Sequence, residues 1–558
     1  MLGSDQVPAR KCIRRSGLTL AAIAIGALAL APGAGAKAKG FKYGVAAGDV
    51  TATSAILWAK AEKSGQALIQ ISEAGGFGKC DLDDAPGKLK VEALKSHDNT
   101  VQKEVTGLDP GTGYAYRFCM DGSAKSETGK FETAPDKKSK QTITFGLSGD
   151  QDARPTPGAS EPFWNNFEVW NAIRKQKNDF NVLLGDTIYS DTEVPGYTID
   201  DVALTVKQKW EAYKTNLAMK PWSKARGAAS YYAHWDDHEF INNFSPAANT
   251  FPLDVGTVNT DGQQLYKRSV DAFTDYNPIS YSKKDGIYRS VRWGKNLEIF
   301  FLDERSFRST TADYQGNCDN PPGSGNRDFA PTAPASTRST FSPLIPQFNN
   351  PPPQSCLDAI NDPNRTFLGQ RQLQRFEKAV KASEATFKVI FNEVPIQQYY
   401  IDPYDRWEGY EAERQQLLRY LRDNVKNAVF LTTDVHANLV NDARFCTLES
   451  NCPQASGILD VTTGPIATAT YSLEISNAIG NPSGGVAAHD AFLKPPPPDG
   501  VGMQCAAMDQ FSYAQVEVTK KQLTVDQLDA NDQPVKDTAD RNDVATAPAC
   551  AQVVIPKQ

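Results

Sequence analysis

Signatures of several familiar enzyme classes are missing from this 558-residue sequence. It has no Gly-x-Ser-x-Gly segment, which argues against a covalent serine nucleophile. It has no Gly-x-x-x-x-Gly-Lys-Ser/Thr segment, so phosphoryl transfer driven by a nucleotide would lack its phosphate cradle. It also has no Cys-x-x-Cys pair, so a zinc ribbon has no support. Any chemistry therefore has to come from other side chains.

Positive charge is also in short supply, because 59 lysines and arginines are outnumbered by 66 aspartates and glutamates. A surface that binds nucleic acid is normally basic, so we expect none here. Hydrophobic residues make up 40% of the chain and charged residues 22%, which is ordinary for a folded protein and excludes wholesale disorder. The chain is too long for one ordinary domain.

Long apolar runs are absent apart from one near the N-terminus. Leu18–Leu30 follows four basic residues and precedes the small residues 34–36. The run is too short to span a bilayer comfortably, and the pattern is typical of an export signal that is cleaved before Lys37. We predict a signal peptide at residues 1–36 and a secreted, periplasmic or cell-surface protein, with Arg14-Arg15 hinting at twin-arginine export. An uncleaved anchor or a buried helix is the alternative.

Cysteine usage agrees with export. Nine cysteines are present, and one of them, Cys12, lies in the predicted signal. The remaining set is Cys80, Cys119, Cys318, Cys356, Cys446, Cys452, Cys505 and Cys550. An even number in an exported chain predicts disulfides, although the sequence does not give their connectivity. Local pairing is favoured, Cys446 with Cys452 above all, and free cytosolic thiols are the alternative.

The chain divides at a polar linker, residues 136–140. Residues 41–135 consist of short alternating runs with turns between them, which predicts an all-β sandwich resembling fibronectin type III modules. Residues 141–555 alternate strands with helical stripes, which predicts an α/β domain. Within it, residues 319–353 are rich in Pro, Gly, Ser and Asn and are expected to form a loop insertion.

Helical stripes are expected at three places in this second domain. The first joins Phe163, Phe167, Trp170 and Ile173, the second joins Leu373, Phe376 and Val380, and the third begins between Arg414 and Leu421.

Five apolar, β-prone runs each end at carboxylates, and this pattern carries the functional argument. The strand-end groups are Asp150; Asp186; Asp236, Asp237, His238 and Glu239; Asp303 and Glu304; and Asp434 with His436. Ligands bind outside the carboxyl ends of strands in open α/β sheets, and carboxylates gathered there repel one another unless protons or cations intervene. Only five histidines exist in the chain, and two of them belong to these groups. The set predicts a metal site with oxygen and nitrogen ligands, although a single strand-end Asp is more often a helix cap.

The order of these motifs strongly resembles PhoD-type alkaline phosphatases, from about residue 41 to about residue 470. The matching segments are Gly44-Val-Ala-Ala-Gly-Asp49 with Leu57-Trp58, Gly185-Asp-Thr-Ile-Tyr189, Trp235-Asp-Asp-His-Glu239, Leu302-Asp-Glu-Arg305, Trp407-Glu-Gly-Tyr410 and Asp434-Val-His436. The resemblance implies a four-layer α/β metallophosphatase domain of the calcineurin-like superfamily, with two stacked mixed sheets after the β-sandwich. It also implies that a small phosphate monoester or phosphodiester is hydrolysed when a metal-bound hydroxide attacks phosphorus. A phosphodiesterase or phospholipase D-like enzyme using the same site is the alternative, and a non-catalytic secreted binding protein is less favoured.

The resemblance also assigns roles to individual residues. The implied metal ligands are Asp150, Asp186, Tyr189, Asp237, Asp434 and His436, and the implied catalytic residues are His238 and Arg305. Asp186 would bridge the metals, and Tyr189 would bind ferric iron. His238 would steer the phosphate or protonate the leaving group. Arg305 would clamp phosphate oxygens or form a structural salt bridge.

The expected ions are Fe³⁺ and Ca²⁺, with Mn²⁺, Mg²⁺ or Zn²⁺ as alternatives, and we expect a monomer without a stable membrane span. Two departures from the family pattern bear on the metals. Asp150 stands where the family commonly has an iron-binding cysteine, which leaves the identity of that ion open. Thr433 replaces a glycine in the closing motif, and a β-branched residue does not easily adopt φ > 0. We therefore expect the backbone there to differ.

Overall fold

The computed structural model describes residues 39–82, 89–120, 124–449, 454–539 and 546–558. The predicted signal peptide and Cys452 lie outside these residues. None of the described helices combines the length and the apolarity needed to cross a membrane.

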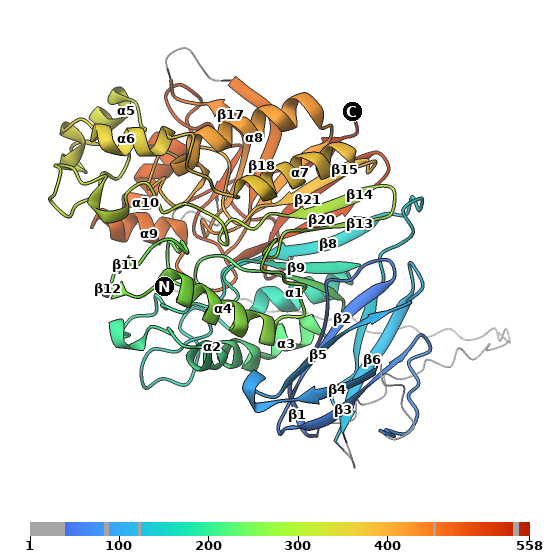
Figure 1. Ribbon diagram of the computed structural model, residues 1–558. Coiled ribbons are helices and arrows are strands. Elements are labelled where there is room, and N and C mark those ends of the chain that lie inside the picture. Colours follow the sequence, from blue (N-terminus) through green and yellow to red (C-terminus); the bar gives the residue numbers. More distant parts are fainter. Residues whose placement is uncertain (1–38, 83–88, 121–123, 450–453, 540–545) are drawn as a thin grey trace, which may run out of the picture. The chain divides into compact units, whose positions relative to one another are not determined.

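Two large sheets form the centre of the fold (Figure 1). The first has the order β22-β21-β20-β8-β9-β10-β1-β2-β5 and is built from β1 (Phe41–Gly48), β2 (Ser54–Ala61), β5 (Thr100–Thr106), β8 (Ile143–Ser148), β9 (Phe180–Leu184), β10 (Ser230–His234), β20 (Ser512–Val518), β21 (Gln522–Asp529) and β22 (Val553–Pro556). The second has the order β13-β14-β15-β16-β18-β17-β19 and is built from β13 (Arg289–Trp293), β14 (Leu297–Phe301), β15 (Phe387–Phe391), β16 (Ala428–Thr432), β17 (Asn438–Cys446), β18 (Gln454–Thr462) and β19 (Cys505–Ala507). Both sheets are mixed, because parallel pairs at their centres, such as β8–β9 and β14–β15, are flanked by antiparallel pairs, such as β20–β8 and β13–β14.

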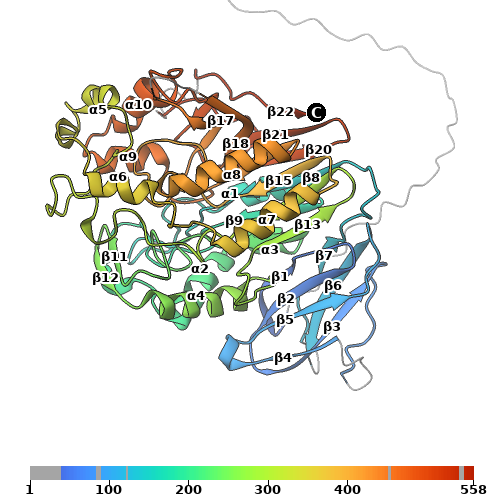
Figure 2. The ribbon, with the colours of Figure 1, turned by 45° about the horizontal axis from the view of Figure 1, so that its top comes forward.

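The described residues form ten α-helices, and some of them cover the outer faces of the two sheets. The helices are α1 (Glu168–Gln176), α2 (Val206–Ala218), α3 (Lys220–Arg226), α4 (Gly262–Tyr276), α5 (Ala335–Phe341), α6 (Gln354–Asn361), α7 (Gln370–Ala382), α8 (Glu411–Asn424), α9 (Tyr471–Ala478) and α10 (Gly484–Ala488). Apolar residues of α1 to α4 pack on the first sheet, and those of α7 and α8 pack on the second (Figure 2). A third apolar layer lies between the sheets, where the rings of Phe145 and Phe391 are 5.9 Å apart. The result is the expected four-layer α/β arrangement.

The N-terminal strands form the expected β-sandwich, but only one of its two sheets is separate from the rest of the fold. A four-stranded sheet with the order β4-β3-β6-β7 contains β3 (Gly65–Ser72), β4 (Lys90–Ala93), β6 (Gly113–Met120) and β7 (Gly129–Glu132). Its apolar face packs on β1, β2 and β5. Because β1 also pairs with β10 in parallel, through Ala47 with Ser230 and Gly48 with Tyr231, these strands continue the first large sheet across the expected linker.

The apolar patterns in the sequence correctly predicted the positions of several strands and helices of the second domain. The five apolar runs that precede acids coincide with β8, β9, β10, β14 and β16, and the second and third stripes fall on α7 and α8. The first stripe is longer than the helix it predicted, because α1 begins only at Glu168 and Phe163 is exposed in the preceding loop. The proline-rich insertion contains α5, which is held by a buried ion pair between Arg338 and Asp328. A short hairpin, β11 (Thr250–Leu253) and β12 (Gly256–Asn259), stands apart from the large sheets.

Three local disulfides are described: Cys80–Cys119, Cys318–Cys356 and Cys505–Cys550. Cys446 is also disulfide-bonded. The predicted pair with Cys452 involves a residue outside the described part of the chain.

Candidate metal centre at the strand ends

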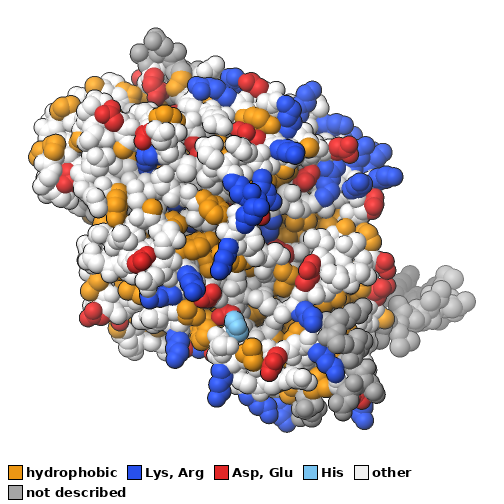
Figure 3. Space-filling view, in the orientation of Figure 1, with side chains coloured by type: hydrophobic (Ala, Val, Ile, Leu, Met, Phe, Trp, Pro, Cys, Tyr) orange, Lys and Arg blue, Asp and Glu red, His pale blue; other side chains and the backbone are white. Residues whose placement is uncertain are grey.

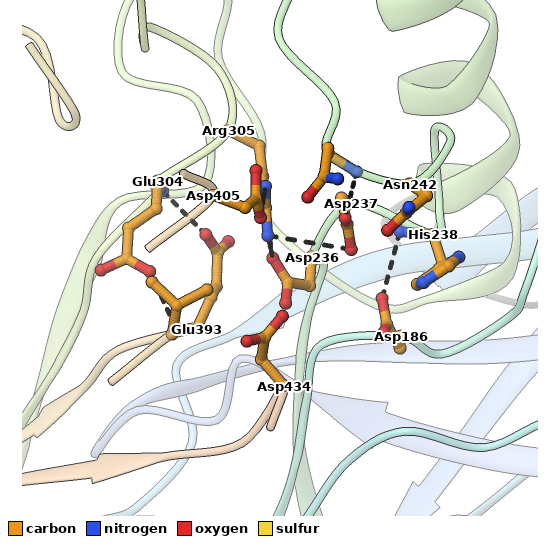
Figure 4. Close-up of polar contacts among 12 residues, drawn as sticks. Asp186, Asp236, Asp237, His238, Asn242, Glu304, Arg305, Glu393, Asp405 and Asp434 are labelled. Carbon is orange, nitrogen blue, oxygen red and sulfur yellow. Dashed lines mark hydrogen bonds and ion pairs between the residues drawn. The ribbon is translucent and has the colours of Figure 1, made fainter. Parts of the chain in front are cut away.

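The acidic strand ends meet at one edge of the two sheets, where several carboxylates point toward one another (Figure 4). Four of the predicted ligands have positive φ angles: 62° at Asp150, 45° at Asp186, 67° at Asp434 and 54° at His436. Such backbone is uncommon for residues other than glycine and clusters at functional sites. The turn at the closing motif thus falls on Asp434, and Thr433 keeps an ordinary φ, so a threonine replaces the expected glycine without backbone strain.

The described residues contain four groups of side chains with ligand atoms within 4.8 Å of one another; one is Glu193, His436 and Glu474, and the other three overlap at the strand ends. The three overlapping groups are Asp150, Asp186 and His436; Asp186, Asp237 and His238; and Asp236, Asp237 and Asp434. Asp186 and Asp237 each belong to two of these three groups. Tyr189 joins the first group, because its hydroxyl lies 2.9 Å from Nε2 of His436. All six predicted ligands are therefore brought together, and Asp236 is added to them.

Several of these carboxylate oxygens are buried without a hydrogen-bond donor among the described residues. Oδ2 of Asp150, Oδ2 of Asp236 and Oδ1 of Asp237 are buried and accept no hydrogen bond from any described residue. Burial and the nearby Asp434 raise the pKa of Asp150 to about 8. Burial and the nearby Asp237 raise the pKa of Asp434 to about 7. Unpaired buried carboxylate oxygens are costly, and bound cations would remove that cost, so the residues present fit a cluster of metal ions.

Arg305 lies beside this cluster and differs from the other predicted site residues. Its side chain is fully buried. The guanidinium pairs with Asp236, lies 3.7 Å from Asp237 and donates from Nη1 to Asp405 at 2.6 Å. It does not line the cavity described below. Of its two predicted roles, the geometry favours the structural salt bridge over a clamp on the phosphate.

Each histidine of the site is held by a carboxylate that the sequence analysis did not single out. Nδ1 of His238 lies 2.7 Å from Asp191, whose other oxygen accepts from the backbone N–H of Asn242 at 2.7 Å. Nδ1 of His436 contacts Glu474 on α9. Asp191 lies two residues after the Gly185–Tyr189 motif, so its position in the sequence could have marked it as a site residue. Glu474 lies in a different element from His436, and no local pattern marks it.

The electrostatics of His238 are set by these neighbours. Burial alone would lower the pKa of His238, but Asp191 and Asp186 outweigh burial and raise it well above its usual value. Its ring stacks on Tyr189 with 4.2 Å between ring centroids, and its backbone N–H donates to Oδ1 of Asp186 at 3.1 Å. His238 is therefore a fixed, proton-carrying group next to the candidate ligands.

A cavity of about 1030 Å³ opens over the cluster. Asp186, Asp237, His238, Asp434 and His436 all line it. A ligand in this cavity therefore has direct access to the carboxylates and to both histidines.

Comparison with known proteins places this arrangement in a family. A family model of PhoD-like phosphatases matches residues 157–527, and a model of the N-terminal domain of PhoD-like phosphatases matches residues 27–135. The four-layer α/β chain thus belongs to the PhoD-like phosphatase family.

Individual relatives agree with this assignment. The chain is 24% identical over 444 residues to alkaline phosphatase D of Bacillus subtilis (strain 168), a match that covers 71% of this chain and 64% of that protein. The chain thus spans a little less than two thirds of this relative. The solved structure of PhoD superposes with a TM-score of 0.65 at 18% identity, covering 94% of this chain and 91% of that one. At that identity the superposition shows a shared fold.

Proposed function

We propose that the protein is a metal-dependent phosphoric ester hydrolase of the alkaline phosphatase type. The observation that carries the proposal is the gathering of buried carboxylate oxygens without hydrogen-bond donors at a cavity that also contains two histidines. Membership of the PhoD-like phosphatase family supports the same reaction class.

The donor atoms suggest which ions would bind where. Asp150, Asp186, Tyr189 and His436 offer a phenol, an imidazole and carboxylates, a set suited to ferric iron. Asp236, Asp237 and Asp434 offer oxygen alone, which suits Ca²⁺ and leaves Mg²⁺ or Mn²⁺ as alternatives. When bound, such ions would polarise the phosphoryl oxygens and offset the negative charge of the transition state. Glu474 would fix the orientation of His436 for this purpose.

The protein's own part in the reaction centres on His238. Asp191 holds Nδ1, which leaves Nε2 free in the cavity to donate a proton to the departing alcohol oxygen. Asp191 and Asp186 raise the pKa of His238, which favours the protonated ring. The stacked Tyr189 ring and the backbone bond to Asp186 restrict the imidazole to one orientation.

A phosphodiesterase, including a phospholipase D-like one, is the second candidate at the same site. The size of the cavity favours it, because about 1030 Å³ leaves room for a second ester group beside the phosphorus. A non-catalytic binding protein is less favoured, because every candidate ligand is retained.

Activity assays test both candidates. Purified protein should hydrolyse nitrophenyl phosphate, bis-nitrophenyl phosphate or both, lose that activity after chelation, and regain it when metal is restored. Full activity in the chelated protein would refute the metal-dependent reaction, and a strong preference for the diester would favour the second candidate.

A further inference from the structure

Exposed apolar side chains gather at the cavity over the candidate ligands. Six large hydrophobic side chains are exposed among the described residues, and three of them line this one cavity: Phe163, Val255 and Leu473. They are 42%, 43% and 41% exposed. They come from the loop before α1, the turn between β11 and β12, and helix α9. Three separate segments thus contribute exposed apolar surface to the same opening.

Part of the cavity wall is apolar as well, beside charged residues such as Arg327, Asp402 and Arg406. Trp164, Leu253, Phe329, Ile401 and Ile475 also line the cavity. In Figures 1 and 2 the β11–β12 hairpin and α9 lie on the same side of the described chain. On the face visible in Figure 3, exposed hydrophobic side chains are mostly dispersed among charged and polar ones. Scattered apolar residues are normal on a protein surface, whereas a gathering around a cavity marks a binding site.

The apolar wall and the acidic groups share one cavity, so one ligand can contact both. A phosphoryl group fills only a small part of about 1030 Å³, a volume at the upper end for pockets that enclose drug-sized molecules. With the phosphoryl group beside Asp186, Asp237 and His238, the rest of the ligand would extend along apolar side chains. Such surface gains free energy from covering an apolar chain and nothing from covering a small polar alcohol.

We propose that this apolar wall binds the alcohol portion of the substrate, and that the preferred substrates are phosphate esters of alcohols with an extended apolar chain. The proposal rests on the proposed ester hydrolysis. In that reaction water adds to phosphorus, the bond between phosphorus and the alcohol oxygen breaks, and the alcohol leaves with a proton from His238. Inorganic phosphate and the free apolar alcohol are the products of a monoester.

A series of n-alkyl phosphates from ethyl to octyl tests the proposal. All of them release a primary alcohol of nearly the same basicity, so differences in rate report binding of the chain. Each should be used below the concentration at which it aggregates. We expect kcat/KM to rise about threefold to fourfold for each methylene until the cavity is filled. A flat or falling profile would overturn the proposal, and so would a rise that appears only with aggregated substrate, because that marks adsorption to a surface.

Matched variants locate the effect. Leu473→Ser and Val255→Ser should each lower the octyl-to-ethyl ratio of kcat/KM by about threefold to fivefold. Leu94→Ser and Val554→Ser remove equally exposed side chains, 40% and 46% exposed, that do not line the cavity, and should leave the ratio unchanged. Thermal unfolding shows whether each variant is folded. Because Val255 and Leu473 come from separate segments of the chain, each variant tests the proposal by itself.

The outcomes separate this inference from the reaction on which it rests. An unchanged ratio in both folded cavity variants would overturn the inference while ethyl phosphate is still hydrolysed. Failure to hydrolyse any ester of the series would instead overturn the proposed reaction, and the inference with it.

Discussion

Asp186 connects the candidate ligand groups, since it belongs to two of them and also accepts a hydrogen bond from the backbone of His238. Asp186→Asn removes a charge but not the shape of the side chain. We expect kcat for ester hydrolysis to fall by about three orders of magnitude, because bound metals contribute several kcal/mol to such reactions. The bound metal per chain should fall as well.

Asp254→Asn is the matched control, because Asp254 lines the same cavity but belongs to none of the ligand groups. Its kcat and metal content should stay close to those of the unmodified protein. Wild-type kcat and unchanged metal in Asp186→Asn would show that Asp186 is not a ligand.

Arg305 illustrates how one side chain fits two hypotheses that make different predictions. As a buried partner of Asp236 and Asp405, it should be needed for stability. Removing one member of a buried ion pair leaves uncompensated charge, so Arg305→Met should lower the free energy of unfolding by about 3–5 kcal/mol. Chemical denaturation measures this loss.

The exposed pair of Arg422 and Asp423 supplies a comparison. Arg422→Met should leave the free energy of unfolding essentially unchanged, because an exposed ion pair contributes little. If Arg305→Met kept full stability and only raised KM, the phosphate clamp would be the correct role.

At the level of helices and strands, the sequence predicted what local pattern encodes. An apolar run followed by an acid located β9 and placed Asp186 at its end. The pairing of β1 with β10 could not be predicted in this way, because it joins segments far apart in the chain. The hydrogen bonds of this pair are made by the backbone, so they impose no repeating pattern on the side chains. The same limit explains Glu474, which reaches His436 from another element.

One contact between elements should give stability a pH dependence. His489 begins a π-helical turn, His489–Leu493, after α10, and its ring nitrogens lie 2.7 Å from Asp490 and 3.1 Å from Asp537. Burial would lower the pKa of His489, but Asp537 and Asp490 outweigh burial and raise it. A raised pKa in the folded state means that the stabilisation is fully present below the unfolded pKa of about 6.5 and is lost as pH rises through the folded value.

His489→Gln should therefore cost on the order of 1–2 kcal/mol of unfolding free energy at pH 5.5 and clearly less at pH 9. Denaturant unfolding of both proteins at the two pH values checks the difference. An equal loss at both values would mean that protonation of the ring adds nothing to the contact.

For the molecule as a whole, the described disulfides Cys80–Cys119, Cys318–Cys356 and Cys505–Cys550 are consistent with the predicted export, because such bonds persist in oxidising compartments. Mass spectrometry of protein from the producing cells should find an N-terminus near Lys37 and no free thiols. A soluble cytoplasmic form that retains Met1 and reduced cysteines would contradict export.

We propose that carboxylates at the strand ends hold metal ions beside a phosphate-binding cavity. Anomalous difference maps from crystals of protein purified without added metal, recorded on both sides of the iron edge and at a long wavelength for calcium, test it most directly. We predict an iron peak among Asp150, Asp186, Tyr189 and His436, and a lighter ion among Asp236, Asp237 and Asp434. Maps without any peak at these residues, from crystals of protein that still hydrolyses phosphate esters after chelation, would contradict the claim.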